Sequence, residues 1–115
     1  MQTKKEYGNK GEALVVEYLM KKGYMILNRN WRCGHWELDI VAEKDGVIVF
    51  VEVKTRRRET LPRDAISERQ IRTLTQAAEM YLREMTQVKE CRFDLVMVNK
   101  TGDLSKIEHI ESAFR

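Results

Sequence analysis

The chain has 115 residues, of which 43% are hydrophobic and 34% are charged, with a formal net charge of +3. This composition excludes a disordered chain and predicts one folded domain, residues 1–115, whose core needs no disulfide. Membrane spans need roughly 20 apolar residues and signal peptides need an apolar segment, and the sequence offers neither. We therefore expect a cytoplasmic protein that does not bind a membrane, with Cys33 and Cys91 reduced.

The first half of the chain predicts one helix followed by three strands. A helix is expected from about Glu6 to Lys22, and a short strand begins at residue 24 and ends near Asn28. Segments 36–43 and 47–54 form a hairpin, because Asp45-Gly46 supplies the positive φ angles of a tight turn. The second hairpin strand is apolar on both faces, which indicates a central strand. The inward positions of the helix are predicted to include Ala13, Val16, Leu19 and Met20.

The next segment predicts a loop and then a second long helix. Residues 55–66 are polar, hold the only proline, Pro62, and are expected to form the loop. Ser67 and Gln70 have the S-x-x-Q spacing of a capping box, so the helix should run from there to about Met85.

The C-terminal segment predicts one buried strand and a second, shorter one. Residues 93–98, FDLVMV, predict a buried strand, and residues 106–110 form a short edge strand after a turn. The resulting order, helix–strand–strand–strand–helix–strand with this further strand, predicts the α/β class. We expect a central mixed sheet of four to five strands flanked by helices.

Four acids and one lysine stand where apolar side chains are expected. Glu12 lies on the inward stripe of the first helix. Glu37 and Asp39 share one face of the first hairpin strand, and Glu52 shares a face of the second with Lys54. Buried carboxylates are costly unless they are paired or bound to a cation, so this pattern indicates a cation site.

A magnesium or manganese ion would account for these acids. Asp39 and Glu52 on neighbouring strands are expected to bind it, because Mg²⁺ prefers oxygen ligands and binds together with substrate phosphates. The backbone carbonyl of Val53 adds a third ligand, and Glu12 completes the set directly or through water. Lys54 then orients an attacking water or stabilises negative charge in a phosphoryl transition state.

Arginines follow the hairpin and indicate a polyanion. Arg56, Arg57 and Arg58 come directly after the candidate site and are expected to contact a nucleic-acid backbone. Arg32 is a further expected contact.

Each of these assignments has an alternative that the residues leave open. Glu52 and Lys54 are either site residues or an exposed pair on an edge strand. Glu12 either faces the site or complements the dipole at a helix N-terminus. Glu37 either supports the site or is a solvated strand charge, and the arginine run is alternatively a solvated loop.

The spacing of these residues resembles a known nuclease signature. Asp39, twelve residues and then Glu52-Val53-Lys54 resemble the D…(D/E)-x-K element of restriction-endonuclease-like nucleases. An acid on a preceding helix, as at Glu12, resembles the branch that contains archaeal Holliday-junction resolvases. Almost the whole chain resembles the YraN-like proteins (uncharacterised protein family 0102). The matching pieces are G-E at 11–12, G-Y at 23–24, R-N-W-R at 29–32, E-L-D at 37–39, F-V-E-V-K-T-R at 50–56, A-A-x-x-Y-L at 77–82, R-F-D at 92–94 and H-I…A-F at 109–114.

The resemblance implies a restriction-endonuclease-like core and a metal-dependent nuclease. DNA, including branched DNA, is the expected substrate, and the implied catalytic set is Glu12, Asp39, Glu52 and Lys54. A nucleic-acid binding module of the same fold that does not cleave is the alternative, and a structural protein with a buried polar network is a third possibility. A homodimer would suit a branched substrate but does not follow from the sequence.

One position departs from the resembled pattern. The family commonly has Gly directly before E-[IL]-D, and this chain has Trp36 there. The bulk of the indole is expected to alter access to Glu37.

Overall fold

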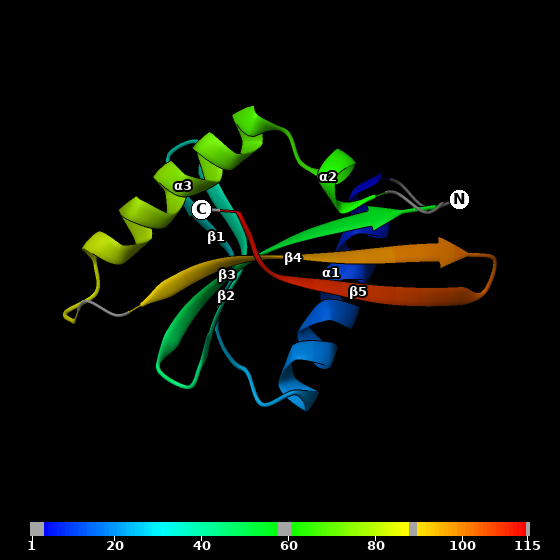
Figure 1. Cartoon of the computed structure of the whole chain (residues 1–115), viewed down its shortest axis with the longest axis horizontal. Helices are drawn as coiled ribbons and strands as arrows, with labels where there is room; N and C mark the ends of the chain where they lie inside the picture. The colour runs from blue at the N-terminus through cyan, green and yellow to red at the C-terminus, as the bar shows by residue number, and fades with distance from the viewer. Residues whose placement is uncertain (1–3, 58–60, 88–89, 115) are drawn as a thin grey trace.

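The computed structural model describes residues 4–57, 61–87 and 90–114 (Figure 1). The elements are α1 (Lys4–Lys21), β1 (Met25–Cys33), β2 (Trp36–Lys44), β3 (Val47–Arg56), α2 (Pro62–Ala65), α3 (Glu68–Arg83), β4 (Cys91–Thr101) and β5 (Leu104–Phe114). The strands form one sheet in the order β1-β2-β3-β4-β5, in which β3 and β4 are parallel and the other neighbours are antiparallel. The predicted α/β class, with two long helices and a mixed sheet, is confirmed.

β3 is the central strand, as its apolar sequence predicted. Val49 and Val51 belong to the core cluster that α1 completes, while Ile48 and Phe50 belong to the cluster under α3. Alternate residues of a strand point to opposite faces, so a strand that is apolar at every position can bury both.

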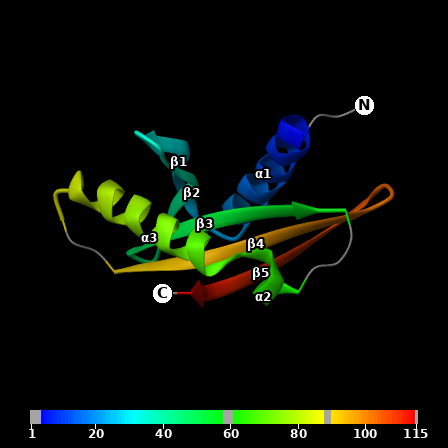
Figure 2. The same cartoon turned by 90° about the horizontal axis from the view of Figure 1, so that it is seen from above.

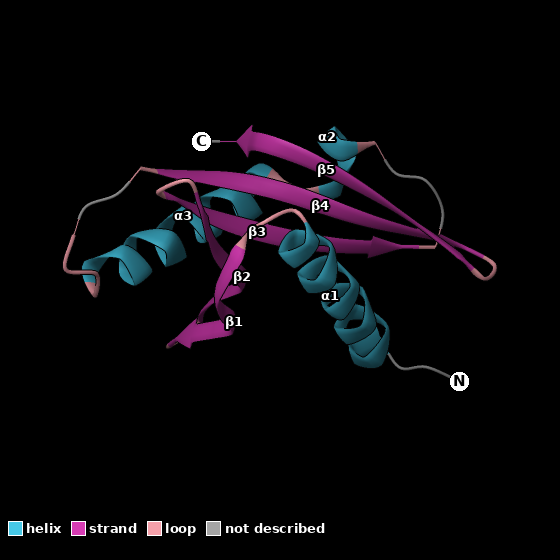
Figure 3. Ribbon diagram, turned by 90° about the horizontal axis from the view of Figure 1, so that it is seen from below, coloured by secondary structure: helices cyan, strands magenta, loops and turns pink. Residues whose placement is uncertain are grey.

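The β1–β2 hairpin leaves the rest of the sheet partway along β3 (Figures 2 and 3). β2 pairs with β3 from Lys44↔Val47 to Ile40↔Val51, whereas β3 pairs with β4 as far as Arg56↔Asn99. Beyond Val51, the side of β3 that faced β2 is therefore no longer paired with it. We call this place, where β2 diverges from β3, the fork.

Several boundaries differ from those predicted. β1 continues to Cys33 instead of ending near Asn28, because it stays paired with β2 across a register shift. Thr55 and Arg56, predicted as loop, extend β3, and a short helix follows with Pro62 in its first turn, where a missing N–H is tolerated. The short final strand is the eleven-residue β5, since pairing with β4 supplies what its polar sequence does not indicate.

The buried stripe of α1 also differs from the prediction. Gly11, Val15 and Leu19 are buried at i, i+4 spacing, whereas Met20 is 61% exposed. The capping box of α3 is confirmed: Ser67 Oγ accepts from Gln70 N and Gln70 Oε1 accepts from Ser67 N, both at 3.1 Å. In the described ranges no helix is long and apolar enough to cross a membrane.

Candidate functional site

Asp39 lies at the fork, one residue beyond the last register pair of β2 and β3. Continuing that register places it opposite Glu52. Its Oδ2 accepts a hydrogen bond from Val53 N at 2.9 Å, which satisfies an amide that β2 no longer pairs. The N–H and the carbonyl of a strand residue point to the same side, so the Val53 carbonyl also faces the fork.

Glu52 is held in its protonated form when no cation is bound. Burial, a hydrogen bond with Asp39 and the charge of Asp39 together raise the pKa of Glu52 from 4.5 to about 9, although the charge of Lys54 opposes the shift. Phe50 and Leu74 line a small cavity with Glu52 and supply the apolar surroundings that disfavour its charge.

Glu12 reaches the same region from α1. Burial and the nearby charge of Asp39 raise the pKa of Glu12, while Arg29 lowers it. Oε1 of Glu12 is buried and has no hydrogen-bond partner. The preceding residue, Gly11, lets the helix approach this closely, because a Cβ there would collide with the Thr55 side chain. A buried carboxylate oxygen without a partner is a position that a cation would satisfy.

The oxygen atoms gathered at the fork are ligands of the kind that a divalent cation prefers, although the side chains do not converge on one point. Among the described residues, no three His, Cys, Asp or Glu side chains are placed to bind one ion as they stand. Asp39 and Glu52 offer two carboxylates, and Val53 offers a carbonyl on the same side. Glu12, whose Oε1 has no partner, lies close enough for the charge of Asp39 to raise its pKa. A small all-oxygen set is typical of Mg²⁺ and Mn²⁺, which keep several waters.

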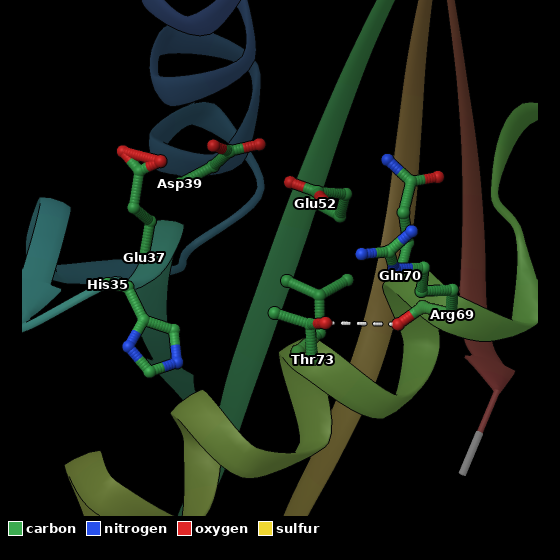
Figure 4. A pocket seen from close by; sticks show the side chains of 8 residues that line it. His35, Glu37, Asp39, Glu52, Arg69, Gln70 and Thr73 are labelled. Carbon is green, nitrogen blue, oxygen red and sulfur yellow. Dashed lines mark hydrogen bonds between the residues drawn. The ribbon is translucent and has the colours of Figure 1, made fainter.

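A pocket of about 260 Å³ lies between the fork and α3 (Figure 4). Figure 4 shows Glu37 and Asp39 on one side, Arg69 and Gln70 of α3 on the other, and Glu52 between them. The residues that line it are His35, Glu37, Asp39, Glu52, Arg69, Gln70, Thr73 and Leu74. Arg69 and Gln70 were not predicted as site residues, because Gln70 was assigned to the capping box and an arginine in the first turn of a helix is ordinarily exposed to solvent.

Lys54 and Glu37 stand at the edge of this site. Lys54 is half-buried, and its charge lowers the pKa of Glu52, but it is not among the residues lining the pocket. Glu37 lines the pocket and also pairs with Arg32, at 2.9 Å between Nη2 and Oε1. Both partners are exposed, so this ion pair contributes little to stability.

The predicted nucleic-acid contacts are only partly placed. Arg56 is half-buried at the end of β3 and donates from Nη1 to the Thr55 carbonyl at 3.0 Å. Arg57 is exposed directly after it. Arg58 lies outside the described residues.

A second charged cluster joins α1, β4 and β5, and sequence reasoning gave it no role. Asp94 is fully buried and accepts hydrogen bonds from Arg92, from Ser112 N and from His109 Nε2, the last at 2.7 Å. Burial acts to raise the pKa of Asp94, but the hydrogen bonds from His109 and Arg92 hold it below the usual 3.8. Tyr18 bonds to the other ring nitrogen of His109 at 3.0 Å. Three residues of this cluster lie in two matching pieces of the sequence, Arg92 and Asp94 in R-F-D and His109 in H-I, which are separated along the chain.

Comparison with known proteins supports the family resemblance. A family model described as "Uncharacterised protein family UPF0102" matches residues 11–98. The chain belongs to this family. A UPF0102 protein of Syntrophomonas wolfei is 47% identical over 113 residues, which cover 96% of this chain and 98% of that protein. A UPF0102 protein of Bacteroides fragilis is 44% identical over 110 residues, covering 93% and 90%. The UPF0102 match begins at Gly11-Glu12 and spans the fork and α3.

Proposed function

We propose that this UPF0102 protein is a metal-dependent nuclease that hydrolyses phosphodiester bonds in nucleic acid. DNA, including branched DNA, is the proposed substrate, and the cytoplasm is the proposed compartment. The observation that carries the proposal is the gathering of carboxylates at the fork. Asp39 and Glu52 are opposite in register where β2 diverges, and Glu12 contributes a buried oxygen that has no partner.

The residues of the fork have distinct roles in this proposal. Asp39, Glu52, the Val53 carbonyl and Glu12 would hold a Mg²⁺ or Mn²⁺ ion, which supplies electrostatic stabilisation to a phosphate oxygen. A bound cation would favour the ionised form of Glu52, because the raised pKa of this residue reflects the cost of an uncompensated charge. Lys54, two residues along β3, orients water or stabilises negative charge on the phosphate.

A nucleic-acid binding module that does not cleave is the second candidate. It is favoured by the finding that, within the described ranges, no three ligand-type side chains are set to bind one ion. This candidate predicts salt-sensitive DNA binding that survives the loss of Asp39 and Glu52. It also predicts that the binding falls when Arg56–Arg58 are replaced by Ala.

The first test is thermal stability in the presence of Mn²⁺ or Mg²⁺, for the wild type and for Asp39→Asn. A ligand that binds only the folded state adds about 2.7 kcal/mol at a hundredfold excess over Kd. Asn can still accept the hydrogen bond from Val53 N, so the variant should fold. Asp103→Asn, in the exposed turn between β4 and β5, is the matched control.

Cleavage of linear and four-way-junction DNA is then assayed with the same three proteins. We expect metal stabilisation and metal-dependent cleavage in the wild type and in Asp103→Asn, and neither in Asp39→Asn. If Asp39→Asn cleaves as well as the wild type, the nuclease proposal is wrong. Binding without cleavage by the wild type would support the binding module instead.

A further inference from the structure

Arg69 faces the acidic side of the pocket without pairing to it. It lies in the first turn of α3 and lines the same pocket as Glu37, Asp39 and Glu52 (Figure 4). Within the described ranges its guanidinium forms no ion pair with these carboxylates. The guanidinium of Arg69 is therefore separated from the three acids by a space that a ligand group can enter.

The turn of α3 that carries Arg69 is held in place by its own hydrogen bonds. The capping box of Ser67 and Gln70 fixes the start of the helix, and Thr73 Oγ1 donates to the Arg69 carbonyl at 3.1 Å. Leu74 is buried against the core directly afterwards. The backbone that presents Arg69 is thus positioned before a ligand arrives, which lowers the entropic cost of binding.

The size of the pocket limits what it can take. Trp36 Nε1 donates to Gln76 Oε1 at 3.3 Å, and this contact joins the β1–β2 hairpin to α3. The volume of about 260 Å³ is below the roughly 300 Å³ at which small-molecule sites begin. The pocket therefore suits one phosphate with part of its sugar, and a guanidinium is the side chain best shaped to bind phosphate oxygens in pairs.

We propose that Arg69 binds a backbone phosphate of the nucleic acid in this pocket, across from Asp39 and Glu52. The identity of the ligand rests on the proposed function, but the assignment concerns binding and does not require cleavage. Arg72 is an exposed arginine on the same helix that does not line the pocket. Replacing it removes the same charge from the same helix, so Arg72→Ala is the matched control.

The test measures DNA affinity by fluorescence anisotropy across a range of salt concentrations. The probes are a fluorescein-labelled four-way DNA junction and a linear duplex of the same sequence, with Ca²⁺ in place of Mg²⁺. We expect Arg69→Ala to weaken binding about tenfold or more, as for a lost charge-assisted hydrogen bond. The slope of log K against log salt should also fall by about 1 in Arg69→Ala, while Arg72→Ala keeps the wild-type slope. Arg69→Lys should keep the slope and recover part of the affinity, because it retains the charge without the paired donors.

The outcomes separate this assignment from the nuclease proposal. If Arg69→Ala and Arg72→Ala bind alike, the assignment is overturned, whether or not the wild type cleaves DNA. If Arg69→Ala loses affinity and slope while the wild type cleaves nothing, the phosphate site stands and the nuclease proposal fails. A wild type that binds neither probe overturns both.

Discussion

Glu52 connects the candidate site to a stability that depends on pH. Its pKa is about 9 in the folded protein against an ordinary 4.5, so between these values the folded state binds more protons than the unfolded state. The contribution of Glu52 to stability is therefore largest below pH 4.5 and falls as the pH rises to about 9, by about 1.4 kcal/mol per pH unit. At pH 7 the accumulated loss is about 3 kcal/mol.

Replacing Glu52 by Gln should remove this loss. Gln has the shape and donor capacity of the protonated acid, so Glu52→Gln should match the wild type near pH 4 and exceed its stability by about 3 kcal/mol at pH 7. The measurement is urea unfolding in EDTA from about pH 4 to about pH 9. Saturating Mn²⁺ should reverse the order, because only the wild type offers the second carboxylate.

The control for this experiment is Glu79→Gln, the same change at an exposed position of α3. It should shift stability by less than about 0.5 kcal/mol at every pH. A gap between Glu52→Gln and the wild type that is the same at pH 4 and pH 8 would refute the reasoning, and so would a less stable variant at pH 7. The pKa of Glu12 is also raised, but Glu12 is present in both proteins, so it does not change the sign of the difference in stability between them.

Two further predictions concern the scaffold around the site. Gly11→Ala should destabilise by about 1 kcal/mol in urea unfolding, although helix propensity alone favours Ala, because its Cβ meets the Thr55 side chain. Adding Thr55→Ala should recover most of this loss, and a Gly11→Ala protein as stable as the wild type would contradict the close approach. Asp94→Asn should destabilise by about 3 kcal/mol, since it breaks a buried ion pair with Arg92. Asp103→Asn should change stability by less than about 0.5 kcal/mol, and equal thermal shifts for the two Asp variants would count against the buried cluster.

Strand periodicity predicted much of the fork. The tight turn at Asp45 and Gly46 has the expected positive φ angles of 52° and 81°. A hairpin register counted from that turn brings Asp39 opposite Glu52, and period-2 alternation puts Glu52 and Lys54 on one face of β3.

Other parts of the fold depend on contacts that no local pattern encodes. Gly11 of α1 packs closely against Thr55, and on this helix Val15 is fully buried while Val16 is only partly buried. The polar stretch of β1 around Arg29 has little strand signal of its own, and pairing with β2 extends it.

The same limit applies to the candidate site. Arg69 lines the pocket because α3 packs beside β2, and no local sequence pattern specifies that packing. Asp94 and His109 lie in separate motifs of the sequence, and the pairing of β4 with β5 brings them together.

The indole of Trp36 has a mechanical consequence for the carboxylates. The β1–β2 hairpin is fastened at its root by the pairing of β2 with β3, and near its tip by the bond from Trp36 to Gln76. The hairpin is therefore attached at both ends, and Asp39 lies on β2 between the two points of attachment. A glycine at position 36 has no ring to form the second attachment, so a residue that does not line the pocket helps to hold the hairpin that carries Asp39.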